Sequence, residues 1–261
     1  MIKNNFVFFI LLLFFTFLNN KISMADQRSE IIKNISSYPI YYYENTNAII
    51  NILAFQGTHG TRNPGDINIA PWEYLSKNFF LKGYNFFQFP NKNIAEPLLP
   101  GDRIKKKEII RIESFNNFIK SKYLKKKNIY MGHHYGALSI LEFMTTTNNR
   151  FEIDAVVLLS YPYFVKSFTD KDYTLKKLKQ INDKNVPILL ILNENDKCEE
   201  IKINKLQTFL KNENLTNIQF KMLNSNVKSK DHACSHRGYH GFMGSEIKLS
   251  NFIDDWLKNI L

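Results

Sequence analysis

The sequence predicts an α/β fold with a mainly parallel sheet that is covered by helices on both faces. From about Ile49 onward, short runs rich in β-branched and aromatic residues alternate with longer amphipathic runs. The strand-like runs are continuously apolar, which is typical of strands buried on both faces. No Ser-, Pro- or Gly-rich linker divides the chain, so residues 26–261 are expected to form a single domain.

The expected order of elements is strand 48–55, helix 72–82, strand 84–89, helix 107–127, strand 128–131, helix 136–144, strand 155–161, helix 173–181, strand 186–192, helix 200–210, strand 218–223 and helix 246–260. Each strand is a short apolar run, whereas each helix repeats its apolar residues at intervals of three and four. The first helix has Pro71 at its start and Gly83 just past its end, which is the usual asymmetry of helix ends.

The composition excludes several classes of protein. With 261 residues, 44% apolar and 14% aromatic, the chain can bury a large core, so disorder, collagen-like repeats and a disulfide-dense miniprotein are excluded. The formal net charge is +11, but the basic runs 103–107 and 125–127 flank expected helices and are interpreted as solvated ends. No basic stripe is interleaved with aromatic residues, so nucleic acid is not an expected partner.

The first 25 residues resemble a secretory signal peptide. A single Lys precedes an apolar run of 13 residues, Phe6 to Leu18, which is shorter than the roughly 20 that a membrane helix needs. Ser23 and Ala25 are small residues where a signal peptidase reads, which predicts cleavage after Ala25. The mature chain is therefore expected to be secreted or periplasmic, without stable membrane insertion; an uncleaved anchor is the alternative.

All six histidines follow expected strands. They are His59, His133, His134, His232, His236 and His240. The carboxyl ends of parallel strands share one edge of a sheet, and ligands bind at that edge. Because imidazole transfers protons and binds metals near neutral pH, this placement predicts a functional site there.

Four segments resemble signatures of the α/β-hydrolase superfamily, in the family's order. They are FQGTHGT (55–61), MGHHYGA (131–137), VPILLILNEND (186–196) and GYHGF (238–242). The resemblance covers about residues 49–261 and implies a three-layer α/β-hydrolase-like fold. Only about 25 residues separate Ser160 from Val186, which leaves little or no room for a cap domain.

The resemblance also implies roles for particular residues. Asp196 stands at the position of the acid and His240 at that of the catalytic histidine. His134 stands where the family carries Ser, Asp or Cys on the nucleophile elbow, between Gly132 and Gly136. The residues expected on the oxyanion side or in the pocket wall are Thr58, His59, Tyr135 and Ser160.

Three functions fit this pattern. The first is a hydrolase of an ester or related bond in which His134 acts as nucleophile or positions water, with His240 as base and Asp196 orienting it. The second is a metal-dependent hydrolase that binds the metal through the same three residues, and the third is a non-catalytic binding protein. A small or polymeric substrate is expected, and no cofactor.

Two cysteines flank these positions in the sequence. Cys198 lies two residues after Asp196, and Cys234 lies six residues before His240. The resemblance places these loops next to each other, and an exported protein meets oxidising conditions, so a Cys198–Cys234 disulfide is expected. Two free buried thiols or a thiolate metal site are the alternatives.

Overall fold

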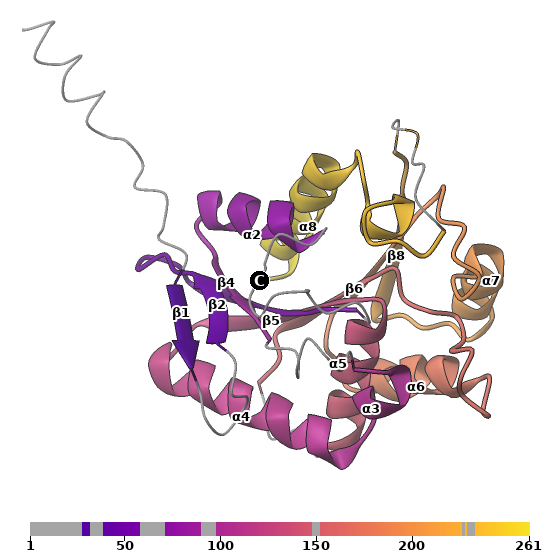
Figure 1. The fold of residues 1–261 in the computed structure, drawn as a ribbon, viewed down its shortest axis with the longest axis horizontal. Helices are drawn as coiled ribbons and strands as arrows, with labels where there is room; N and C mark the ends of the chain where they lie inside the picture. The colour runs from indigo at the N-terminus through magenta and orange to yellow at the C-terminus, as the bar shows by residue number, and fades with distance from the viewer. Residues whose placement is uncertain are drawn as a thin grey trace, which may run out of the picture.

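A sheet of eight strands forms the centre of the structure, in the order β1-β2-β4-β3-β5-β6-β7-β8 (Figure 1). The computed structural model describes residues 28–31, 39–57, 71–89, 98–147, 152–225, 228 and 233–261. The strands are β1 (Arg28–Ile31), β2 (Pro39–Tyr43), β3 (Ile50–Phe55), β4 (Asn85–Gln88), β5 (Lys127–His133), β6 (Ala155–Leu159), β7 (Ile188–Asn193) and β8 (Ile218–Leu223).

Most of the sheet is parallel, as the sequence predicts. β3 pairs in parallel with both β4 and β5, and the parallel pairing continues through β6, β7 and β8. Among the strands that the structure describes, only β1 and β2 pair in antiparallel fashion, at the β4 edge. The carboxyl ends of β5, β6 and β7 therefore lie side by side, and the loops that leave them can share one site.

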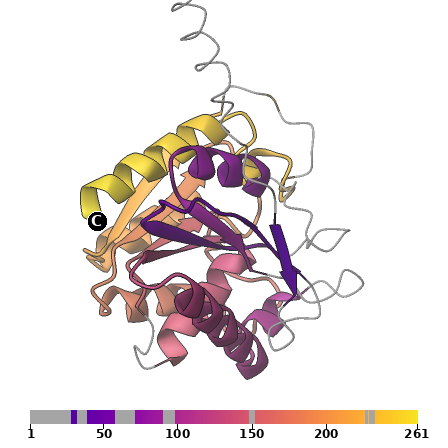
Figure 2. The same ribbon diagram turned by 90° about the vertical axis from the view of Figure 1, so that its left-hand side faces the viewer.

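Helices cover both faces of this sheet. They are α2 (Trp72–Leu81), α3 (Pro100–Arg103), α4 (Lys106–Lys122), α5 (Tyr135–Thr146), α6 (Tyr173–Asn182), α7 (Ile203–Asn212) and α8 (Glu246–Ile260), with a 3₁₀ turn η1 (Tyr239–Gly241). α2 and α8 pack together on one face, whereas α3, α4, α5 and α6 lie on the other, as the turned view shows (Figure 2). The result is the three-layer arrangement expected from the sequence.

Each central strand sends side chains into two cores. On β3, Leu53 and Phe55 pack toward α4 and α5, while Ile52 and Ala54 pack toward α2 and α8. All four are fully buried. Burying a large apolar side chain contributes about 1.5–3 kcal/mol, so burial on both faces explains why these strands are apolar without alternation.

The last helix is tied to the sheet by a buried carboxylate. Asp254 on α8 accepts hydrogen bonds from the hydroxyl of Tyr84 at 2.6 Å and from the ammonium groups of Lys82 and Lys258 at 2.9 Å each. Its three donors offset the cost of burying the charge. Lys82 and Tyr84 lie between α2 and β4, so their bonds hold α8 against the start of β4, whereas Lys258 lies on α8 itself.

The structure differs from the sequence-based expectations in three additional elements and at the ends of two helices. β1, β2 and the short α3 were not expected, the helix expected at 107–127 ends at Lys122, and the helix expected at 200–210 begins only at Ile203. One helix, α6, lies between β6 and β7, so the region where a cap would be inserted is short.

Some expectations fall outside the described residues. The signal peptide at 1–25, Thr58, His59 and His232 all lie there. Among the residues that are described, no helix combines the length and the apolar content needed to cross a membrane.

Candidate active site

His134 stands on a sharp turn between β5 and α5. Its backbone has φ 49° and ψ −117°, a conformation that a residue with a side chain adopts at a cost of about 1–3 kcal/mol. A Cβ added at Gly132 would lie 2.6 Å from the Cα of Ala137, and one added at Gly136 would overlap the carbonyl oxygen of Phe55. Both glycines are therefore required by close packing, and the turn holds the His134 side chain at the carboxyl edge of the sheet.

His240 and Asp196 form a hydrogen-bonded pair beside it. Asp196 follows β7, and its Oδ2 lies 2.8 Å from Nδ1 of His240, which belongs to η1. Its Oδ1 accepts a hydrogen bond from the backbone N–H of Cys198 at 2.9 Å. Because a carboxylate accepts, the Nδ1 of His240 carries the proton, and its Nε2 keeps a free lone pair.

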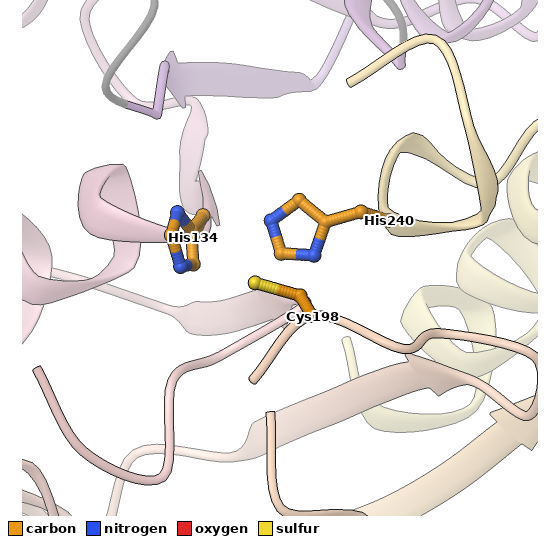
Figure 3. A group of neighbouring side chains, drawn as sticks. All are labelled: His134, Cys198 and His240. Atoms are coloured by element: carbon orange, nitrogen blue, oxygen red, sulfur yellow. The ribbon is translucent and has the colours of Figure 1, made fainter. Parts of the chain in front are cut away.

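The two imidazoles are neighbours and lie nearly perpendicular to each other. The ring centroids of His134 and His240 are 4.5 Å apart, and the ring planes meet at 86°. Figure 3 shows one ring nitrogen of His240 directed toward His134. Among the described residues, Nε2 of His240 has no hydrogen-bond partner, so it is available to a substrate or a water molecule.

The backbone of His240 is held by two further side chains. Its carbonyl oxygen accepts a hydrogen bond from the hydroxyl of Ser160 at 2.7 Å and lies 2.8 Å from Nε2 of His133. Because a carbonyl only accepts, Nε2 of His133 is protonated. Ser160 is fully buried and its hydroxyl is engaged in this contact, so in this structure Ser160 supports the loop that carries His240.

Glu200 is a second acidic group at the site, beside Asp196, and was not expected from the sequence. Its Oε2 accepts a hydrogen bond from the hydroxyl of Tyr135 at 2.5 Å and lies 3.2 Å from Nε2 of His134, while its Oε1 accepts from the backbone N–H of Lys166 at 2.8 Å. The ring of Tyr135 stacks on His134 at 4.0 Å. Glu200 therefore contacts His134 directly and is held in place from two other elements.

Burial sets the charge state of these groups. Desolvation, reinforced by the neighbouring His240, lowers the pKa of His134 from 6.5 to about 4, although Glu200 and Asp196 act in the opposite direction. Burial also holds the pKa of His133 well below its usual value. Burial alone would raise the pKa of Glu200, but the contacts with His134, Tyr135 and the Lys166 N–H lower it overall. Near neutral pH, His134 is therefore an uncharged imidazole beside an ionised carboxylate.

Cys198 and Cys234 form a disulfide, as expected from the sequence. Cys198 is buried next to the two imidazoles, and His134, Cys198 and His240 each offer one donor atom within 4.8 Å of the others. Both oxygens of Asp196 are already hydrogen-bonded, so Asp196 orients His240. Among the described residues, the donor atoms that lie within reach of one metal ion are those of His134, Cys198 and His240, whereas Asp196 lies behind His240.

The described residues thus supply the parts of an acid–base and nucleophilic site. His240 backed by Asp196 can accept and return a proton, as in arrangements where a carboxylate orients a histidine. The uncharged His134 offers a ring nitrogen as a nucleophile, and Glu200 can balance positive charge that develops on that ring.

Several solved structures with a similar arrangement of elements are described as esterases or α/β serine hydrolases. An esterase from Pyrococcus furiosus superposes with a TM-score of 0.61 at 14% identity, covering 90% of this chain and 91% of the esterase. A homologue of α/β serine hydrolases from Coxiella burnetii gives 0.61 at 12% identity, covering 91% and 99%. A serine hydrolase without a lid from Xanthomonas campestris gives 0.59 at 10% identity, covering 90% and 95%.

This likeness shows that the chain has the α/β-hydrolase fold. No family model matches the sequence, and no curated protein matches it either. At these identities the comparison concerns the fold alone, so the chemistry has to be argued from the site of this chain.

The structure brings together most of the residues singled out in the sequence. His134, Asp196 and His240 meet at one point, Tyr135 stacks on His134, and Ser160 lies behind His240. Glu200 is the residue that sequence reasoning missed, because the apolar periodicity placed it inside a helix. Two consecutive acidic residues just after the expected acid loop were the signal that could have identified it.

Proposed function

We propose that the protein is a hydrolase of small esters or related acyl bonds in which His134 is the nucleophile and His240 the general base. The observation that carries the proposal is the pairing of the Asp196-bound His240 with the strained elbow position of His134. Strained backbone persists where the surrounding structure enforces it, and such positions cluster at active sites.

In the first step, the Nδ1 lone pair of His134 attacks the substrate carbonyl carbon. Because Nε2 of His134 faces the ionised Glu200 at 3.2 Å, Nε2 carries the ring proton and Nδ1 is left free. The ester C–O bond breaks, and the alkoxide leaves and takes a proton from solvent. The acylated ring is positively charged, and Glu200 stabilises that charge.

In the second step, water replaces the histidine on the acyl group. Nε2 of His240 accepts a proton from water as the water oxygen bonds to the acyl carbon. The N–C bond to His134 breaks, which restores its lone pair and releases the carboxylic acid. His240 then returns its proton to solvent, so the sum of both steps is ester plus water giving acid plus alcohol.

The test is ester hydrolysis by the mature protein and by His134→Ala and His240→Ala, with a panel of p-nitrophenyl esters. Removal of either imidazole is expected to lower kcat/KM by about 100-fold or more. Any accessible histidine cleaves activated esters slowly, so His236→Gln, at a half-buried position, is the matched control and should keep the parent activity. Mass spectrometry of quenched samples should find the acyl group on His134.

The other functions give different results. A metal-dependent hydrolase loses activity when a chelator is added to the parent protein. A binding protein built on this fold shows only the slow cleavage that an ordinary histidine gives, at the same rate in the parent and in His134→Ala. Equal activity in the parent and in His134→Ala would remove His134 from the mechanism, whereas activity gained by His134→Ser would show that the remaining groups are competent.

We propose in addition that the chain is exported through residues 1–25 and acts outside the cytoplasm on a small or polymeric substrate. The apolar run Phe6 to Leu18 and the disulfide both support this. The mature protein is then expected to begin at Asp26, which N-terminal sequencing of secreted material would test. A retained leader would favour the anchored form.

A further inference from the structure

Three potential metal ligands converge at the site, and one of them is masked by the disulfide. Donor atoms of His134, Cys198 and His240 lie within 4.8 Å of one another, and all three residues are buried. Figure 3 shows the sulfur of Cys198 beside the two imidazole rings. Donors around a tetrahedral zinc ion are about 3.5 Å apart, so shifts on the order of 1 Å would close the site.

The two imidazoles are placed to bind a metal ion. Among the described residues, Nε2 of His240 is buried without a hydrogen-bond partner, and Nε2 of His134 is buried with the Glu200 carboxylate 3.2 Å away. Buried polar atoms are normally paired, so Nε2 of His240 has unused binding capacity, while a neutral His134 has one ring nitrogen without a proton. Asp196 holds Nδ1 of His240, which is the arrangement of a carboxylate behind a metal-binding histidine.

Cys198 completes the set only as a thiolate. In the disulfide its sulfur is bonded to Cys234, whereas a cysteine binds zinc through its deprotonated thiol. A dithiol can reduce the bond: the dithiol is oxidised to its own disulfide, and Cys198 and Cys234 each gain an electron and a proton. A divalent ion then displaces the proton from Cys198.

We propose that reduction of the Cys198–Cys234 disulfide converts the His134–His240 pair into a binding site for Zn²⁺ or a similar soft divalent cation, with Cys198 as third ligand. Glu200, beside Nε2 of His134, is placed to enter as the fourth ligand or to bind a metal-held water. The oxidised form keeps both imidazoles free, and the reduced form engages both. The proposal does not depend on ester hydrolysis.

Two single substitutions separate the sulfur atoms. Cys234→Ser frees Cys198 without any reductant, whereas Cys198→Ser leaves only Cys234 and is its matched control. Co²⁺ reports the ligands, because a thiolate ligand adds a near-ultraviolet charge-transfer band to the visible bands of tetrahedral Co²⁺. Reduced parent protein and Cys234→Ser should bind one Co²⁺ with that band, and oxidised parent and Cys198→Ser should lack it.

Affinity gives a second criterion. Zn²⁺ should bind Cys234→Ser at least about tenfold more tightly than Cys198→Ser, since loss of even a supporting group costs 10–100-fold. Equal affinities, a Co²⁺ complex without the thiolate band, or equal binding by oxidised and reduced parent would each overturn the proposal.

A measurement on the parent chain covers the case in which a variant does not fold. Reduced protein is alkylated with and without Zn²⁺, and the modified cysteine is identified by mass spectrometry. Zn²⁺ should protect Cys198 and leave Cys234 reactive; equal alkylation of both would reject the site. None of these readouts uses esterase activity, so the metal site and the proposed hydrolysis can fail independently.

Discussion

Acid should lower the free energy of unfolding through His134. Replacing His134 by a residue that does not titrate should remove this part of the acid sensitivity. His134 is buried, and its pKa in the folded protein is about 4, compared with 6.5 for an unperturbed histidine. Between these values the unfolded chain binds a proton at His134 and the folded chain does not. The free energy of unfolding therefore falls as the pH drops through this window and is fully retained above it.

The size of the effect follows from the same two values. A tenfold difference in proton affinity corresponds to about 1.4 kcal/mol, so a pKa of 6.5 that falls to about 4 corresponds to about 3 kcal/mol. The free energy of unfolding begins to fall at about pH 6.5, and this contribution is fully lost below about pH 4. His240 opposes the charged form of His134, whereas Glu200 and Asp196 favour it, so these three groups set the final value.

The assay is urea unfolding of the oxidised parent and of His134→Gln, in the presence of a chelator, from pH 7 to pH 4. His133 is present in both proteins, and His134 is only a minor cause of its lowered pKa, so most of its own acid response cancels in the difference between them. That difference in unfolding free energy should change by about 3 kcal/mol across the range. Parallel curves would refute the argument, because they would mean that His134 binds its proton equally in the folded and unfolded states.

Three further predictions concern stability. Reducing the Cys198–Cys234 disulfide, which joins residues 36 apart, should lower the free energy of unfolding by about 4 kcal/mol in metal-free protein; equal urea midpoints with and without a dithiol would contradict this. Gly136→Ala places a Cβ against the carbonyl oxygen of Phe55 and should cost about 3 kcal/mol, and an unchanged melting temperature would show that the elbow can relax. Asp254→Asn weakens three charge-assisted hydrogen bonds and should cost roughly 1–3 kcal/mol at pH 7; because these bonds hold the pKa of Asp254 below its usual value, the difference from the parent should shrink only in acid, as the pH falls through that lowered pKa.

Much of the fold could be predicted because its strands are buried on both faces. The run 188–192 has no polar position, and a covered, mainly parallel sheet accommodates such strands between helices. β1 and β2 were missed because they lack this signature: RSEI is mostly polar, and PIYYY begins with proline. Their pairing is antiparallel at the sheet edge, where less of each strand has to be apolar.

The sequence predicted those site residues that lie in loops directly after strands. His134, Asp196 and His240 each follow a strand, and parallel pairing brings those ends together. Glu200 could not be found in this way, because its contacts are with Tyr135 and Lys166, which are 65 and 34 positions away. Local periodicity extends the helix back to Glu200, but these distant contacts hold the residue outside it.

The two contacts on the carbonyl oxygen of His240 affect how mutagenesis results at this site should be interpreted. Ser160 and His133 both fix the backbone of that residue, and neither needs to touch a substrate. A screen that scores loss of activity would select these two positions together with His240, and Ser160 would be mistaken for the missing serine nucleophile. Under the proposed mechanism, only the acyl group found on His134 distinguishes the residue that reacts from the residues that hold the site in place.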